Sequence, residues 1–251
     1  MRLRIENLAI GYGNHTVQQG LSMQADAGQM VCLLGTNGCG KSTLLRTIAS
    51  LQRPIEGQIF LCDQESNSLS AQERSRLLAL VLTERLAIAN THVTDIVAMG
   101  RYPYSSVLGR LTAEDQQRIQ EAMQQTDILS LKDRYFNSLS DGEKQRVLLA
   151  KAVAQHTPII LLDEPTAHLD LPGRYKTFEL LQRLAHTEEK TILISTHDLD
   201  LALQTADVLW LMKPNDGVVV GTPKDLLQTS VFEELFGGQV EGLVGRFREN
   251  L

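Results

Sequence analysis

The fold is decided by the stretch Gly35-Thr36-Asn37-Gly38-Cys39-Gly40-Lys41-Ser42, which fits the pattern G-x-x-x-x-G-K-[ST]. It follows a short apolar run at residues 30–34 and opens a segment that is typical of a helix. Glycines let the backbone wrap closely around a phosphate group, and the N-terminus of the helix adds partial positive charge. Lys41 can then reach the terminal phosphates, Ser42 can ligate Mg²⁺, and Thr43 is placed for the inner phosphates. We therefore predict a buried strand, a phosphate-binding loop and a helix, in preference to a glycine-rich turn that happens to precede Lys-Ser.

A second apolar run ends in two acidic residues, in the stretch Ile159-Ile160-Leu161-Leu162-Asp163-Glu164-Pro165. Asp163 at the end of this strand can hold Mg²⁺ through water, beside Ser42. Because side chains alternate along a strand, Glu164 is expected to point the other way and to polarise the attacking water as a general base. Burying two adjacent carboxylates is costly, which favours a role in phosphoryl transfer over a solvated strand end.

The composition of the whole chain narrows the class of protein. Its 251 residues are 43% hydrophobic and 22% charged, a balance typical of a globular chain. The formal charge of -6 disfavours general nucleic-acid binding, so we expect no nucleic-acid partner. No apolar run approaches the roughly 18 residues of a membrane span, and the first residues lack the apolar region of a secretory signal. The three cysteines form no C-x-x-C pair, which favours a reduced, cytosolic compartment.

Hydrophobic patterning predicts a single α/β domain over residues 1–251. Alternating apolar residues at 3–23 indicate antiparallel strands, and strand and helix patterns alternate from residue 158 onward. Residues 94–155 carry mostly helical signals. The prediction is therefore an α/β core with an antiparallel strand-rich flank and a helical lobe inserted at about residues 84–156.

Local signals place individual elements within this plan. A helix is expected from Lys41 to about residue 51, and a strand at residues 58–62. The spacing of a capping box, in which the first residue caps a helix and an acid three residues later reaches back, occurs at Ser70 with Glu73 and at Thr112 with Asp115.

Three further motifs follow the phosphate loop in order. The stretch Leu139-Ser140-Asp141-Gly142-Glu143-Lys144-Gln145-Arg146 resembles the L-S-G-G-Q signature of ABC-type ATPases, from whose commonest spelling Asp141 and Glu143 depart. The other two, similar to the D-loop and the switch-histidine segment of that family, are Thr166-Ala167-His168-Leu169-Asp170 and Thr196-His197-Asp198. The resemblance covers nearly the whole chain. It implies a P-loop NTPase (RecA-like) core with an antiparallel β subdomain and an inserted α-helical subdomain, and an ATP hydrolase that uses ATP and Mg²⁺.

The resemblance also implies a head-to-tail homodimer in the ATP-bound state. ATP would lie between the phosphate loop of one copy and the signature of the other, where Ser140 and Gly142 would touch the γ-phosphate. Asp170 would bridge the copies. His197 would contact the γ-phosphate and steady the water held by Glu164, in preference to a purely structural role.

Further nucleotide contacts are implied at Tyr12 and along the phosphate loop. Tyr12 matches the family's adenine-stacking aromatic residue, against the alternative of a partly exposed strand Tyr. Cys39 is interpreted as a small filler, against the hypothesis that its oxidation blocks nucleotide. The loop residues in question are Gly35, Thr36, Asn37, Gly38, Cys39, Gly40, Lys41, Ser42 and Thr43.

One position departs from the family pattern. A Gln usually follows the strand that we place at residues 79–82, where it relays between Mg²⁺, the water and the membrane subunits. This chain has Thr83 instead, followed by Glu84 and Arg85. Thr is too short to span the same distance, so either Thr83 acts at the metal through water or Glu84 substitutes. We expect an altered relay in which hydrolysis survives.

The branch of the family is indicated by residues 93–104, V-T-D-I-V-A-M-G-R-Y-P-Y, which look like the T-V-x-x-L-V-x-x-G-R-x-P-Y segment of importer ATPases for iron–siderophore, haem and cobalamin. Too few residues separate the phosphate loop from the signature for the long coiled coil of DNA-acting relatives. The resemblance implies permease partners in the membrane, indirect coupling to a substrate-binding protein, and a peripheral position on the cytoplasmic face of the membrane. The alternatives are a soluble regulatory or assembly module without a membrane partner and a nucleotide-binding protein that does not hydrolyse; intact Lys41, Asp163, Glu164 and His197 argue against the latter.

Overall fold

The computed structural model describes the chain except for residues 14, 84–89, 106–109, 215 and 250–251. The strands are β1 (Leu3–Tyr12), β2 (His15–Ala25), β3 (Met30–Gly35), β4 (Glu56–Leu61), β5 (Gln64–Glu65), β6 (Leu78–Val81), β7 (Ile159–Asp163), β8 (Thr191–Ser195), β9 (Val208–Met212) and β10 (Val218–Gly221). They form an antiparallel sheet in the order β2-β1-β4-β5 and a six-stranded sheet in the order β10-β9-β3-β8-β7-β6. In the larger sheet only β10 pairs antiparallel. The predicted α/β fold is confirmed.

The helices lie between and after these strands. The α-helices are α1 (Lys41–Ile48), α2 (Ala71–Leu77), α3 (Val93–Ala98), α4 (Ala113–Gln125), α5 (Asp141–Gln155), α6 (Leu171–Glu188), α7 (Leu199–Thr205), α8 (Pro223–Leu227), α9 (Val231–Phe236) and α10 (Glu241–Arg248). Short 3₁₀ helices are η1 (Ser66–Ser68), η2 (Met99–Tyr104), η3 (Leu129–Leu131), η4 (Phe136–Ser138) and η5 (Gly237–Val240). Among the described residues, no helix is both long and apolar enough to cross a membrane.

The core of the larger sheet is buried on both faces. Every residue of β3, β7 and β8 is buried, as expected where helices cover both faces of parallel strands. One hydrophobic cluster joins α1 and the antiparallel sheet to one face, and Leu44, Leu45, Leu33 and Leu161 all belong to it. The other cluster joins α6 and α7 to the opposite face and continues into the helices between β6 and β7. Exposed residues occur in the loops that follow the carboxyl ends of the parallel strands, at Asn37, Gly38 and His197.

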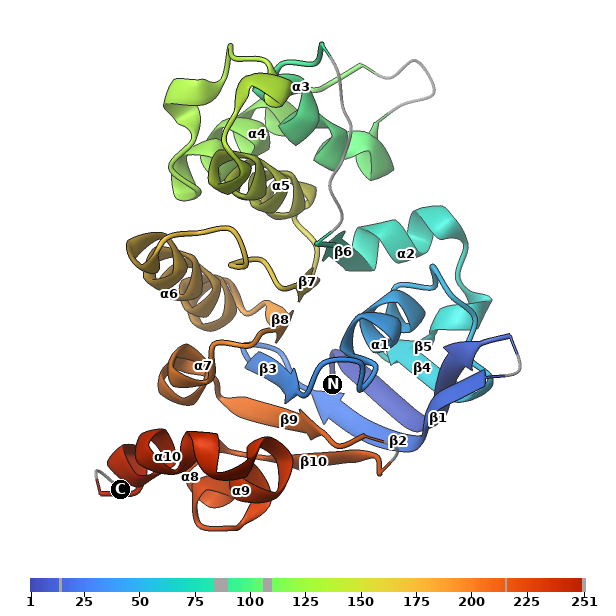
Figure 1. Cartoon of the computed structure of the whole chain (residues 1–251). Helices are drawn as coiled ribbons and strands as arrows, with labels where there is room; N and C mark the ends of the chain where they lie inside the picture. Colours follow the sequence, from blue (N-terminus) through green and yellow to red (C-terminus); the bar gives the residue numbers. More distant parts are fainter. Residues whose placement is uncertain (14, 84–89, 106–109, 215, 250–251) are drawn as a thin grey trace.

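The helices between β6 and β7 form a separate group above the sheets (Figure 1). A buried ion pair joins η2 to α4, where Arg101 Nε lies 2.8 Å from Asp115 Oδ1. Burial opposes ionisation, but hydrogen bonds from Thr112 and Arg101 lower the pKa of Asp115 below its usual range. Arg101 also donates to Ala154 O at 3.0 Å, so one guanidinium holds η2, α4 and the end of α5 together.

Several local predictions are confirmed and some boundaries are corrected. Both predicted capping boxes are present, at the starts of α2 and α4. The first helix ends at Ile48 rather than near residue 51. The strand expected at residues 58–62 is β4, which ends at Leu61 because Cys62 and Asp63 adopt positive φ values of 50° and 64° and turn the chain into β5.

Candidate functional site

The predicted residues of the phosphate loop, the acidic strand end and the switch-histidine segment lie at the carboxyl edge of the larger sheet. The strands β3, β8, β7 and β6 are neighbours in that order, and all four are parallel. The segments that follow them are the phosphate loop, the His197 segment, the Glu164 turn and Thr83. Because parallel strands end at one edge, motifs far apart in the sequence become adjacent there.

The phosphate loop surrounds the ammonium group of Lys41. This side chain is only 6% exposed, and its Nζ donates to Gly35 O at 2.9 Å and to Thr36 O at 3.1 Å. Helix α1 begins after Gly40, and no side chain caps its N-terminus or places an acid in its first turn. Its first N–H groups and a buried cation therefore face the same loop, which is the donor set that a polyphosphate requires.

Two glycines in this loop are required by close contacts. A Cβ at Gly40 would lie 2.9 Å from Val17 Cγ1, and φ there is +108°. A Cβ at Gly35 would lie 2.6 Å from Met212 O and 2.7 Å from Cys39 Sγ. Any larger residue would have to displace β2, β9 or the loop itself.

Cys39 is enclosed by the same loop. Its side chain is 3% exposed. Burial raises the pKa of the thiol, although the nearby Lys41 opposes this effect. A raised pKa disfavours the reactive thiolate, which supports the interpretation of Cys39 as a small filler.

Gln18 supports the loop from β2 and was not singled out from the sequence. The side chain is 2% exposed, and its Nε2 donates to Cys39 O at 3.0 Å and to Lys213 O at 2.6 Å. Its Oε1 accepts from Gly217 N at 3.2 Å. One buried amide thus fixes the loop to the β9–β10 turn. Because Gln18 and Lys213 are 195 positions apart in the sequence, no local pattern could reveal this contact.

Tyr12 lies at the end of β1 and reaches the start of α1. Its hydroxyl and Thr43 Oγ1 form a hydrogen bond of 3.0 Å, while 52% of the residue remains exposed. An exposed aromatic ring anchored beside a phosphate loop can stack on a planar ring of a bound ligand.

Asp163 is held at the end of β7 by its neighbours. It is 4% exposed, and its Oδ1 accepts from Ser195 Oγ at 2.6 Å. Thr83 Oγ1 donates to Asp163 O at 2.7 Å, so the proton of this hydroxyl is bound to the backbone while its oxygen stays beside the strand end. Glu84, the alternative to Thr83, lies outside the described residues. Ser195 was missed in the sequence, although its place at the end of a neighbouring strand was a signal for it.

The donors at this edge suit magnesium. The buried carboxylate of Asp163 and the hydroxyl of Ser42 are hard oxygen ligands, the kind that Mg²⁺ binds together with phosphate oxygens. Asp163 is the last residue of β7, and Ser42 lies at the start of α1, after the loop that follows β3.

Glu164 is paired with His197. The distance between Glu164 Oε1 and His197 Nε2 is 2.5 Å, and the two side chains are 29% and 46% exposed. The sequence suggested that strand alternation sets the direction of Glu164. The structure shows a different cause. The strand ends at Asp163, and Glu164 turns away with φ +48° while its N–H donates to Ser195 O at 3.1 Å. A carboxylate that is reachable by solvent and oriented by an imidazole can accept a proton from water.

A hollow of about 510 Å³ opens beside this pair, and Arg174 is among the residues that line it. Arg174 Nε donates to Leu169 O at 3.1 Å, and its Nη1 lies 3.6 Å from Asp198 Oδ2. The guanidinium therefore ties residues 166–170 to the segment that carries His197. No sequence motif singled out Arg174.

The signature segment lies on the helical group rather than beside the phosphate loop (Figure 1). Ser140 caps α5 and accepts from Glu143 N, and the Glu143 side chain reaches back to Ser140. A Cβ at Gly142 would lie 3.4 Å from His168 O, so this helix end rests on residues 166–170 of its own chain. Asp170 Oδ1 accepts from Gly173 N at 3.0 Å and caps α6. Within one chain, Ser140 and Gly142 are therefore not brought to the phosphate loop.

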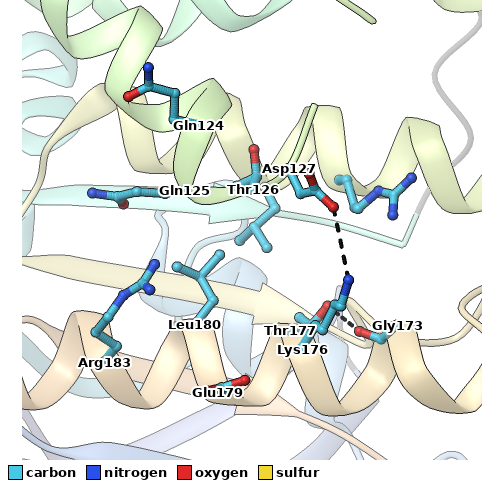
Figure 2. A pocket seen from close by; sticks show the side chains of 12 residues that line it. Gln124, Gln125, Thr126, Asp127, Gly173, Lys176, Thr177, Glu179, Leu180 and Arg183 are labelled. Carbon is cyan, nitrogen blue, oxygen red and sulfur yellow. Dashed lines mark hydrogen bonds and ion pairs between the residues drawn. The ribbon is translucent and has the colours of Figure 1, made fainter. Parts of the chain in front are cut away.

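A second hollow, about 360 Å³, separates the end of α4 from α6 (Figure 2). An ion pair of 3.9 Å between Asp127 and Lys176 spans it, and Arg183 lines its other end (Figure 2). None of the residues predicted for the site lines this hollow. It lies between the helical group and α6 and is distinct from the phosphate loop.

Comparisons with known proteins agree with this geometry. A family model described as ABC transporter matches residues 18–167. The chain is 35% identical to the ferric enterobactin transport ATP-binding protein FepC of Escherichia coli, over 94% of this chain and 87% of that protein. A solved inward-facing metal-chelate type ABC transporter superposes with a TM-score of 0.81 at 30% identity, covering 94% of this chain and 88% of that one. A dimeric bacterial ABC transporter cassette gives a TM-score of 0.79 at 25% identity, covering 88% and 98% of the two chains.

Proposed function

The chain belongs to the ABC transporter family as an ATP-binding, ATP-hydrolysing protein, and on that premise we propose that it powers an importer for iron–siderophore or related metal chelates. The observation that carries this proposal is the similarity, over nearly the whole chain, to an ATP-binding protein of ferric enterobactin transport. The segment that looks like the metal-chelate branch folds as α3 and η2 and is fastened by Arg101 to α4 and α5. The choice of haem, cobalamin or iron–siderophore is left to the partner subunits.

ATP is proposed to bind with its phosphates in the loop around Lys41. The loop offers the uncapped N-terminus of α1 and a buried ammonium group, both of which stabilise negative charge. The exposed ring of Tyr12 is proposed to stack on adenine. The full set of proposed loop contacts is Gly35, Thr36, Asn37, Gly38, Cys39, Gly40, Lys41, Ser42 and Thr43.

Hydrolysis is proposed to depend on residues from four strand ends, those of β3, β6, β7 and β8. Ser42 and Asp163 would hold Mg²⁺, with Thr83 beside them; the ion would neutralise charge that develops on the phosphates. Glu164 would accept a proton from the attacking water, and His197, 2.5 Å from it, would keep the carboxylate oriented and contact the γ-phosphate. Ser195 holds both acids in place, because its hydroxyl binds Asp163 and its backbone carbonyl binds Glu164 N–H.

A head-to-tail homodimer is proposed for the ATP-bound state. One chain carries the phosphate loop and the signature on different parts of its surface, so a complete site requires Ser140 and Gly142 from a second copy. Asp170 lies at the start of α6, next to the residues on which the signature helix rests, and is proposed to bridge the copies. The similarity to a dimeric ABC transporter cassette supports this arrangement.

The partners and the location follow from the same proposal. We assign residues of about 84–156 to a helical subdomain inserted in the single ATPase domain 1–251. The chain would dock on integral membrane permease subunits at the cytoplasmic face of the membrane, and a substrate-binding protein would be coupled to it indirectly. No nucleic-acid partner is proposed for this net acidic chain.

Uptake in cells tests this proposal. A strain that lacks the chain should lose uptake of a ferric siderophore, and the wild-type gene should restore it. Glu164→Gln should fail to restore uptake, because the base is lost, while the purified variant should form an ATP-bound dimer on size exclusion. Unchanged uptake of ferric siderophore, haem and cobalamin in the deletion strain would contradict the importer role. A Glu164→Gln variant that hydrolyses ATP normally would remove Glu164 from the mechanism.

A further inference from the structure

The signature end of α5 carries unusual negative charge for a surface that is proposed to meet a phosphate. Asp141 and Glu143 both lie in its first turn. Glu143 Oε2 accepts from Ser140 N at 2.8 Å and from Ser140 Oγ at 2.9 Å. The hydrogen bond from the backbone of Ser140, followed by that from its hydroxyl, lowers the pKa of Glu143, so this group is ionised at neutral pH.

The ionised carboxylate of Glu143, which is hydrogen bonded to Ser140, creates an electrostatic conflict. The hydroxyl that is proposed to touch the γ-phosphate is already hydrogen bonded to an anion, and the approaching phosphate is another anion. Two neighbouring negative charges repel each other unless a cation compensates them. Without compensation, the capped end of α5 would oppose formation of the nucleotide-bound dimer.

Arg134 lies in position to compensate this charge. Its Nη1 is 3.3 Å from Glu143 Oε1, the oxygen that does not bind Ser140. Its Nη2 donates to Ser138 O at 3.1 Å, just before the signature. Its backbone is fixed as well, because Arg134 N donates to Leu131 O and Arg134 O accepts from Val93 N. The guanidinium therefore joins the segment that precedes α5 to the carboxylate that caps it.

Asp141, the other acidic departure, has its own nearby cation. Lys144 Nζ lies 3.5 Å from Asp141 Oδ1, one helical turn away. This pair involves neither Ser140 nor Glu143. The charge of Asp141 therefore has a compensating cation that is independent of Arg134.

We propose that Arg134 is a positioning residue for ATP-dependent dimerisation: it neutralises Glu143 and so allows the Ser140 end of α5 to accept the γ-phosphate of the partner's nucleotide. This inference rests on the proposed function, since it needs the head-to-tail dimer. Arg134 acts through Glu143 and Ser140 and does not itself touch the nucleotide.

The test measures the ATP concentration that gives half-maximal dimer in the Glu164→Gln background, by size exclusion with light scattering. Arg134→Ala should raise this concentration about three- to tenfold, because a charge pair at the rim of the site is lost. Adding Glu143→Gln should restore it to near the parent value, since the amide still caps Ser140 but carries no charge. The defect of Arg134→Ala should also shrink at high salt, where charges are screened.

The controls separate charge from structure. Arg118→Ala removes a comparable exposed ion pair with Glu121 on α4 and should leave dimerisation unchanged. Arg134→Ala with a normal midpoint overturns the inference. The inference is also overturned if the double variant needs as much ATP for half-maximal dimer as Arg134→Ala does. In that case the role of Arg134 is to hold the backbone at Ser138 O. If the Glu164→Gln parent binds ATP but never dimerises, the proposed dimer itself fails.

Discussion

The N-termini of α1 and α5 are each proposed to meet a phosphate, yet they are built in opposite ways. Helix α1 begins at a left-handed glycine with no side-chain cap and no acid in its first turn, and a buried lysine lies beside it. Helix α5 begins with a complete capping box and two acids in its first turn. The N-terminus of α1 has neither a side-chain cap nor an acidic residue in its first turn. The N-terminus of α5 receives both from Ser140 and Glu143 of its own chain.

This difference indicates how the free energy of nucleotide binding is divided. The loop around Lys41 offers the uncapped N-terminus of α1 and an ammonium group that donates to two backbone carbonyls, and it should supply most of the affinity of a single chain. The signature can add affinity only by exchanging internal hydrogen bonds for contacts with phosphate, which gives a smaller net gain. We therefore expect the phosphate loop to bind ATP in one chain and the signature to control pairing of two chains.

The largest effect is expected at the N-terminus of α1, where the phosphate loop is proposed to bind ATP. Lys41→Ala should weaken ATP binding to a single chain by about 100-fold, because a buried charge that would contact the phosphates is removed. Titration calorimetry would measure this. The matched control is Lys144→Ala at the start of α5, which should leave binding to one chain unchanged. Equal losses in the two variants would contradict the division of roles between the helix ends.

A smaller effect is expected at the N-terminus of α5, where Ser140 is proposed to control dimerisation. Ser140→Ala should leave ATP binding to one chain intact, and in the Glu164→Gln background it should raise the ATP concentration needed for dimerisation by about tenfold. It should also lower the free energy of unfolding by about 1 kcal/mol, because α5 loses its cap. Ser70→Ala, which removes the same type of cap from α2, is the control for stability alone. Loss of dimerisation in both variants would assign the effect to folding.

The smallest effect sharpens the comparison at the edge of the sheet. Thr83→Ala should lower the ATPase rate by about threefold, because its hydroxyl holds the end of β6 on Asp163 O. Thr83→Ser keeps the hydroxyl and should retain the wild-type rate. An unchanged rate in Thr83→Ala, measured alone and with the partner subunits, would remove Thr83 from the site.

Much of the fold could be predicted from the sequence because its signals are local. Capping boxes on α2 and α4 join residues three positions apart, and the apolar run of β7 is uninterrupted. Boundaries were less predictable. The turn at Cys62 and Asp63 depends on positive φ values at two successive residues, and only Asp is of a type that is enriched in this conformation. Glu164 shows the same limit, since its direction comes from a left-handed backbone rather than from strand alternation.

By itself, the amino-acid sequence determined the phosphate loop and the acidic strand end, because each is a contiguous stretch that can be recognised without knowledge of its distant contacts. It also determined the order of the motifs along the chain. Only the tertiary structure decided which side chains hold those motifs in place. Gln18 meets Lys213, Ser195 meets Asp163, and Arg174 meets Asp198 through the packing of separate elements. Such contacts depend on strand order and helix placement, which follow from burial of the whole core and leave no pattern in a local stretch of sequence.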